Sequence, residues 1–140
     1  MIKKGIALLL GCLAYTSLNA TQVSVFVSFS MPDNLLEETL KESARLKIPA
    51  YLNGLHHNSM RETALKVMAL SERIPDLNLQ IDPTAFERFG IHQVPALVVS
   101  QSQAFDVIYG HLPITEGLSR MAARGDSGFS VLDARQVSGE

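Results

Sequence analysis

The stretch FERFGIHQVPALVVS, residues 86–100, decides how this chain is expected to fold. It is typical of a short helix that stops at Gly90, a loop, and an apolar strand that begins directly after Pro95. Proline lacks an N–H and is normally excluded from central strands, so its place at a strand entrance indicates a special backbone geometry. A cis Val94–Pro95 peptide is one candidate and an ordinary trans proline is the other, since most X-Pro bonds are trans.

The bulk composition is that of one ordinary globular domain. The chain has 140 residues, of which 46% are hydrophobic and 19% are charged, with a formal net charge of -2. This is enough apolar material for a core, and nothing in it indicates disorder. Because there is no basic excess, the composition argues against nucleic acid as the main partner.

The first twenty residues, MIKKGIALLLGCLAYTSLNA, predict a secretory signal peptide. Two lysines precede an apolar run from Gly5 to about Tyr15, and a polar stretch leads to Ala20, after which we expect cleavage. The run is short for a membrane span. The alternative is a lipoprotein, because residues 9–12 resemble a bacterial lipobox in which Cys12 would be lipidated.

Cys12 is the only cysteine in the sequence. If the signal is removed after Ala20, the exported chain has no thiol. Disulfide bonds, thiol catalysis and cysteine metal sites are then excluded together, and the domain must be held by its apolar core.

Hydrophobic periodicity predicts the order βαβα, then a short strand and helix, and a closing ββα unit. The expected strands are residues 22–29, 48–55, 77–81, 95–100 and 104–110, and the expected helices are residues 30–47, 58–73, 82–90 and 115–124. In the second helix, four side chains are predicted to face inward: Met60, Ala64, Val67 and Met68. Residues 125–140 show no clear periodicity and are expected to form a flexible tail.

Four polar residues are candidates for helix N-caps. Residues 30–33 and 59–62 fit the capping-box pattern, with Ser30 and Ser59 as the caps. Asp82 before Pro83, and Thr115, are the other two.

The element order predicts an α/β fold with a central mixed sheet flanked by helices. Strand–helix–strand units pair in parallel through right-handed crossovers, and the closing hairpin adds an antiparallel edge. Residues 21–124 are expected to form this single domain.

This order, with Pro95 at the entrance of the hairpin, resembles the thioredoxin fold. IDPTAFERFGIHQVPALVV, residues 81–99, is similar to the segment that precedes the cis-proline of thioredoxins, so the resemblance implies a cis peptide at Pro95. Thioredoxins carry C-x-x-C where the first strand meets the first helix. Here residues 30–33 read Ser-Met-Pro-Asp, so the resemblance in fold cannot extend to thiol–disulfide exchange.

A narrower resemblance rests on three motifs: FVSFSMP at 26–32, RET at 61–63 and DPTAFERFGIHQVPA at 82–96. Together they resemble the TrbC family of F-type conjugative pilus-assembly proteins, over about residues 23–122. The resemblance implies a periplasmic protein of a type IV secretion system, with no catalytic activity, cofactor or small-molecule substrate, and with a TraW-type protein as partner. Related domains also occur fused behind TraW-like segments.

Two groups of residues are candidate chemical sites. Ser30 and Asp33 are interpreted as a helix cap rather than a catalytic pair, because an activated serine needs an oriented base and no G-x-S-x-G elbow is present. His56 and His57, with His92, could be metal ligands. We expect no metal there, because adjacent histidines usually point apart and no carboxylate has helical metal spacing with them.

A partner-binding surface is predicted where the loop before Pro95 meets the start of the first helix. In thioredoxin-like folds this surface binds extended peptides through backbone hydrogen bonds. The residues proposed for it are Met31, Pro32, His92, Gln93, Val94 and Pro95. The alternative is an inherited groove with no occupant.

The sequence is compatible with two classes of function. One is an assembly or scaffold protein of the conjugation machine, and the other is a redox-inactive thioredoxin-like chaperone with many clients. A single dominant partner would favour the first class, and a broad set of clients would favour the second.

Overall fold

The computed structural model describes residues 21–140, so the predicted signal peptide and Cys12 lie outside the described residues. The strands are β1 (Gln22–Val27), β2 (Ala50–Leu52), β3 (Leu79–Ile81), β4 (Ala96–Gln101) and β5 (Ala104–Tyr109). The helices are α1 (Asp33–Arg45), α2 (Met60–Arg73), α3 (Pro83–Arg88), α4 (Ile114–Met121) and α5 (Val131–Ser138), with a 3₁₀ turn η1 (His56–Asn58) before α2. Within this part of the chain, no helix is long and apolar enough to cross a membrane.

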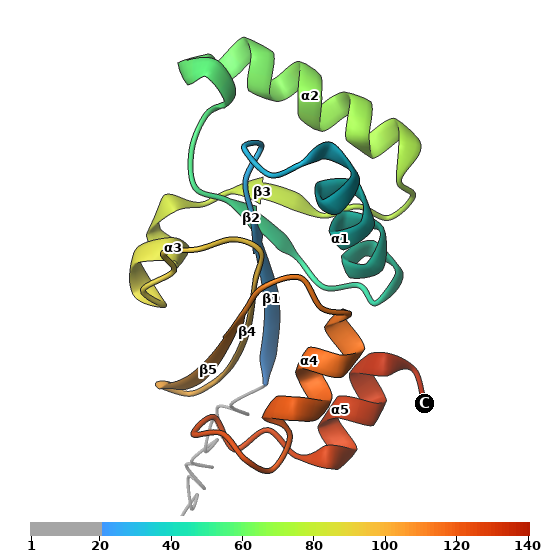
Figure 1. Cartoon of the computed structure of the whole chain (residues 1–140), viewed down its shortest axis with the longest axis vertical. Helices are drawn as coiled ribbons and strands as arrows, with labels where there is room; N and C mark the ends of the chain where they lie inside the picture. The colour runs from blue at the N-terminus through green and yellow to red at the C-terminus, as the bar shows by residue number, and fades with distance from the viewer. Residues whose placement is uncertain (1–20) are drawn as a thin grey trace, which may run out of the picture.

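The strands form one mixed sheet of order β3-β2-β1-β4-β5, which confirms the predicted α/β class (Figure 1). β1 pairs in parallel with β2, and β2 with β3, as the strand–helix–strand order requires. β4 is antiparallel to both β1 and β5. The peptide bond between Val94 and Pro95, just before β4, is cis.

Alternation along β1 builds a core on each face of the sheet. Val25 and Val27 belong to the larger core, which α1, α4 and α5 cover. Phe26, between them, points to the other face, where it meets Phe86 of α3 edge-on at 4.9 Å between ring centroids. Figure 1 shows α1 and α4 on one side of the sheet and α3 on the other. The central strand is therefore buried on both faces, as its apolar run predicts.

The apolar stripe of α1 is confirmed, but its predicted cap is wrong. Leu36, Leu40 and Ala44 are buried, as the four-residue spacing indicates. The N-cap is Pro32, with no side-chain cap, so the helix begins two residues later than the capping box at Ser30 requires. The Ser30 hydroxyl instead pairs with the Ser28 hydroxyl at 2.8 Å.

The predicted inward face of α2 is correct only at Val67, which is half-buried and packs against the larger core. Ala64 is exposed, Met60 and Met68 are 62% and 59% exposed, and the buried residues are Thr63 and Leu70. The buried face of α2 differs from the predicted one because Thr63, a polar residue, points toward the core. Its hydroxyl donates to the Ser59 carbonyl at 2.6 Å and accepts the His56 N–H at 2.7 Å, so its burial leaves no unpaired polar group.

The observed orientation of α2 predicts a large loss of stability at Leu70 and almost none at Met68. Leu70→Ala should lower the free energy of unfolding by about 2–5 kcal/mol, because it opens a cavity in the larger core. Met68→Ala should change it by less than about 0.5 kcal/mol, because its side chain is largely in solvent. Urea unfolding of the two variants measures both. Equal losses would contradict the orientation of α2.

The caps at Ser59 and Asp82 are confirmed. The Ser59 hydroxyl accepts the Glu62 N–H at 3.1 Å, and the Asp82 carboxylate accepts the Ala85 N–H at 3.2 Å. The second half of the Ser59 capping box is replaced, since the Glu62 carboxylate bonds to His57 instead of returning to the backbone.

The cap predicted at Thr115 is wrong, because α4 begins after Pro113. The N–H groups of Ile114 and Thr115 are accepted by the Glu42 carboxylate of α1, at 2.8 and 3.4 Å. Glu42, which lies 72 positions from Ile114 in the chain, thus caps α4 in place of a local residue. No local sequence pattern could indicate this contact.

The prediction of a flexible tail over residues 125–140 is wrong. Phe129 is only 2% exposed and belongs to the larger core, and α5 follows it. Ser130 and Asp133 form a complete capping box at the start of α5. The helix is too short to show a periodicity, and its main anchor precedes it, so the hydrophobic pattern alone gave no signal.

Candidate functional site

The loop between α3 and β4 is held in place from β5. The Tyr109 hydroxyl donates to the Gly90 carbonyl at 3.2 Å and lies 3.1 Å from His92 Nδ1. The rings of Tyr109 and His92 are 4.6 Å apart. This end of the loop is therefore a fixed surface feature, with His92 and Gln93 exposed.

The residues predicted for partner binding are divided between the core and the surface. Met31 is 6% exposed, and its sulfur accepts the Ser28 N–H at 3.4 Å. Val94 is half-buried and packs against both core clusters. Pro32, like His92 and Gln93, is exposed. Of this set, the residues available to a partner are the exposed ones and the half-buried Pro95.

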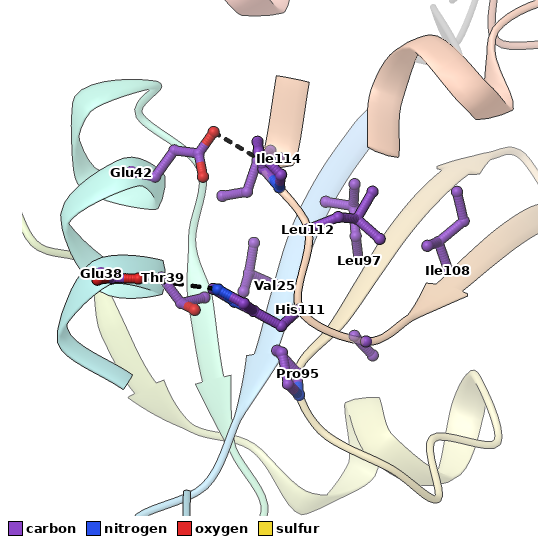
Figure 2. A pocket seen from close by; sticks show the side chains of 13 residues that line it. Val25, Glu38, Thr39, Glu42, Pro95, Leu97, Ile108, His111, Leu112 and Ile114 are labelled. Atoms are coloured by element: carbon purple, nitrogen blue, oxygen red, sulfur yellow. Dashed lines mark hydrogen bonds and ion pairs between the residues drawn. The ribbon is translucent and has the colours of Figure 1, made fainter. Parts of the chain in front are cut away.

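Pro95 itself lines a pocket of about 210 Å³ on the α1 and α4 side of the sheet, which we call the Pro95 pocket (Figure 2). Its apolar walls come from β1, β4, β5 and the segment before α4: Val25, Pro95, Ala96, Leu97, Ile108, Leu112, Pro113 and Ile114. Three polar side chains of α1 also line it: Glu38, Thr39 and Glu42. Sequence reasoning missed this pocket because its residues come from four separate segments.

The polar side of the Pro95 pocket is acidic. Glu42 is occupied by the backbone of α4, as described above. Glu38 is exposed and forms only a loose pair with His111, at 3.9 Å between Oε2 and Nε2. An apolar cavity beside a solvated carboxylate suits an apolar side chain of a partner that also carries a positive charge.

Among residues 21–140, the Ser30 hydroxyl has no partner of the kind that nucleophilic catalysis needs. It is exposed and bonded to Ser28, another hydroxyl, which cannot act as a general base at neutral pH. The interpretation of Ser30 and Asp33 as a cap is wrong, and the contacts give no support to a catalytic pair.

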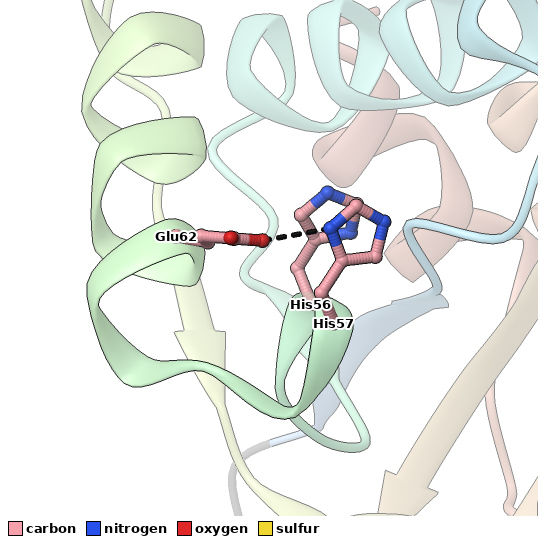
Figure 3. Close-up of side chains that lie close together, drawn as sticks. All are labelled: His56, His57 and Glu62. Atoms are coloured by element: carbon pink, nitrogen blue, oxygen red, sulfur yellow. Dashed lines mark hydrogen bonds and ion pairs between the residues drawn. The ribbon is translucent and has the colours of Figure 1, made fainter.

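His56 and His57 are brought together, contrary to the expectation that adjacent histidines point apart (Figure 3). Their rings stack with centroids 3.8 Å apart. The cause is the backbone of His57, whose φ of 51° and ψ of 32° lie in the left-handed region and turn its side chain back over His56. His92 is not part of this cluster and lies beside Tyr109.

Glu62 completes this group, and sequence reasoning missed it. Its Oε2 lies 2.7 Å from His57 Nδ1, and one ligand atom from each of the three residues lies within 4.8 Å of the others. Burial lowers the pKa of His56, the charges of His57 and Lys66 lower it further, and Glu62 partly opposes them. The sequence does place Glu62 five residues after His57, in the first turn of the predicted second helix. That short spacing was the signal that could have indicated the group.

Comparison with known proteins places these features in a family. Residues 25–130 match the family model described as type-F conjugative transfer system pilin assembly protein. The chain is also 44% identical over 101 residues to the periplasmic protein TrbC of Escherichia coli (strain K12), an alignment that covers 72% of this chain and 48% of that protein. This chain thus spans about half the length of that curated relative. No solved structure matches this chain. The chain belongs to the family of type-F conjugative transfer system pilin assembly proteins.

Proposed function

We propose that this chain is a periplasmic, non-catalytic assembly protein for the conjugative pilus of an F-type type IV secretion system. The observation that carries the proposal is the family match, which extends over residues 25–130 and so covers most of the domain. The periplasmic name of the relative and the predicted signal peptide, cleaved after Ala20, both favour export. Anchoring through Cys12 is the alternative form of the same exported protein.

We further propose that the fold is thioredoxin-like. The order of helices and strands, the closing antiparallel hairpin and the position of Pro95 before β4 support this assignment. The residues that replace C-x-x-C support a scaffold role, because Ser30 and Asp33 offer neither a thiol nor a paired nucleophile.

The chain works, in this proposal, through contacts with other components of the secretion machine, and with a TraW-type protein first among them. The proposed contact surface comprises the exposed residues Pro32, His92 and Gln93 and the half-buried Pro95, and it extends into the Pro95 pocket with Glu38 and His111 at its side. Because this surface combines an apolar cavity with a solvated carboxylate, the partner segment should present an apolar side chain next to a lysine or arginine.

Site-specific photocrosslinking during pilus assembly tests this surface. A crosslinker at Gln93 or at His111 is expected to capture one dominant partner, a TraW-type protein, because both positions are exposed beside the proposed surface. Gln136, an exposed residue of α5, is the matched control and should give little of that product.

The same experiment separates the two function classes. A broad ladder of products from position 93 would favour the redox-inactive chaperone. A dominant product at Gln136 with none at Gln93 and His111 would refute the proposed surface while leaving the assembly role intact. Mating efficiency of each labelled strain shows whether the label itself disturbs assembly.

A further inference from the structure

The cluster of His56, His57 and Glu62 lies where two parallel strands end. β1 ends at Val27 and β2 at Leu52, and the loops that follow them line a pocket of about 410 Å³ that includes both histidines. Crevices at the carboxyl ends of strands in open α/β sheets are the usual places for ligands. The cluster is separate from the Pro95 pocket, with which it shares no lining residue.

Hydrogen bonds and ring packing position His56 and Glu62 within the fold. The His56 N–H donates to the buried Thr63 hydroxyl at 2.7 Å, and the Glu62 N–H donates to the Ser59 hydroxyl at 3.1 Å. The His56 ring packs edge-on against Phe29, at 5.5 Å between centroids. The fold thus brings the two histidines and the glutamate close together before any ligand arrives.

Two consecutive residues of this turn have left-handed backbones, although neither is glycine. His57 has a φ of 51° and Asn58 a φ of 52°. Such conformations are uncommon, and where they cluster they often mark a functional site. Here their effect is specific, because they bring one imidazole back over the other and toward the carboxylate of the next helix.

We propose that His56, His57 and Glu62 bind one divalent late-transition-metal ion, of the class of Zn²⁺. Two imidazole nitrogens and one carboxylate oxygen suit zinc, copper or nickel, whereas calcium and magnesium prefer oxygen ligands alone. Ligand bonds of about 2.0–2.2 Å require the stacked rings to fan apart so that their lone pairs converge. The metal takes the place of the direct contact between His57 Nδ1 and Glu62 Oε2.

Solvent access allows this adjustment and leaves the ion open. The side chains of His57 and Glu62 are 71% and 52% exposed, so they can rotate without disturbing the core. Three protein ligands leave at least one position of a tetrahedral zinc ion free for water or for a side chain of another protein.

Isothermal titration with ZnCl₂ on the purified, untagged full chain at pH 7 tests the site. We expect one ion per chain. His57→Ala and Glu62→Gln are each expected to weaken the affinity by more than roughly tenfold, because each removes a ligand. His92→Ala and His111→Ala, which remove histidines outside the cluster, should leave the affinity unchanged.

Melting curves without metal show whether the variants fold, and their exposed positions predict that they do. Zn²⁺ should also raise the melting temperature of the parent chain and of His92→Ala, but not that of His57→Ala. The proposal is overturned if zinc shows no saturable binding, or if binding persists unchanged in His57→Ala and Glu62→Gln. CaCl₂ and MgCl₂ should give no comparable heat.

Discussion

Phe129→Ala is expected to lower the free energy of unfolding by about 3–5 kcal/mol, a large part of the usual stability of a domain of about 5–15 kcal/mol. Phe129 is 2% exposed in the larger core, and its carbonyl accepts the Ala123 N–H at 2.7 Å. Removing its ring leaves a cavity beneath α5 and frees the segment that fixes this helix. Urea or thermal unfolding of the variant measures the loss.

Leu132→Ala is the matched control for Phe129→Ala. Leu132 lies three residues further along and is 66% exposed, so its removal should change stability by less than about 0.5 kcal/mol. A stop codon after Arg124 should destabilise the chain at least as much as Phe129→Ala, because it also removes α5. If all three variants melt like the parent, the C-terminal segment is not part of the folded core.

The parts of the fold that sequence reasoning predicted well are those in which periodicity and burial coincide. β1 alternates Val25, Phe26 and Val27 between two cores, and α1 repeats Leu36 and Leu40 on one face. In both elements the buried set is apolar throughout, so the pattern has one interpretation. The mixed sheet followed from the element order through the crossover rule.

Prediction failed where a polar group is buried or where a contact comes from far along the chain. Thr63 takes an inward place on α2, and the face chosen from the apolar residues alone is therefore displaced. Glu42 caps α4 from another helix. Phe129 reaches the core from a segment without periodicity. None of these can be derived from a local window, because each depends on the assembled fold.

The motifs that carried the family resemblance combine residues that make the fold with exposed residues such as Glu62, His92 and Gln93. Phe26, Met31, Thr63 and Phe86 are all buried, and Asp82 is a helix cap. The buried part of these motifs specifies the core and a helix start, and it does not identify which surface contacts a partner. This explains why the family could be inferred from the sequence, whereas the Pro95 pocket and the histidine cluster required the assembled structure.

Asp106→Asn is expected to lower the free energy of unfolding at pH 7 by about 1.5–3 kcal/mol, the usual worth of hydrogen bonds to a charged group. The Asp106 carboxylate on β5 accepts the N–H of Asp126 at 2.7 Å, the N–H of Ser127 at 3.0 Å and the Ser127 hydroxyl. It thereby fastens the turn before Phe129 to the edge of the sheet. Gly125 belongs to the same turn, and a Cβ there would overlap this carboxylate, so Gly125→Ala should displace it as well.

The effect of Asp106→Asn should depend on pH in a defined direction. Burial raises the pKa of Asp106, but the bonds from Ser127 and Asp126 outweigh burial and hold the pKa below the ordinary value of 3.8. A carboxyl whose pKa is depressed by folding stabilises the folded state above the unfolded pKa, and this contribution is lost as the pH falls through the folded pKa. Unfolding measured from pH 7 down into the acid range should therefore show the two proteins converging. Asp126→Asn keeps its backbone donor and is the control, expected to match the parent throughout. A gap between Asp106→Asn and the parent that stays constant into the acid range would show that the charge of Asp106 is not what holds this turn.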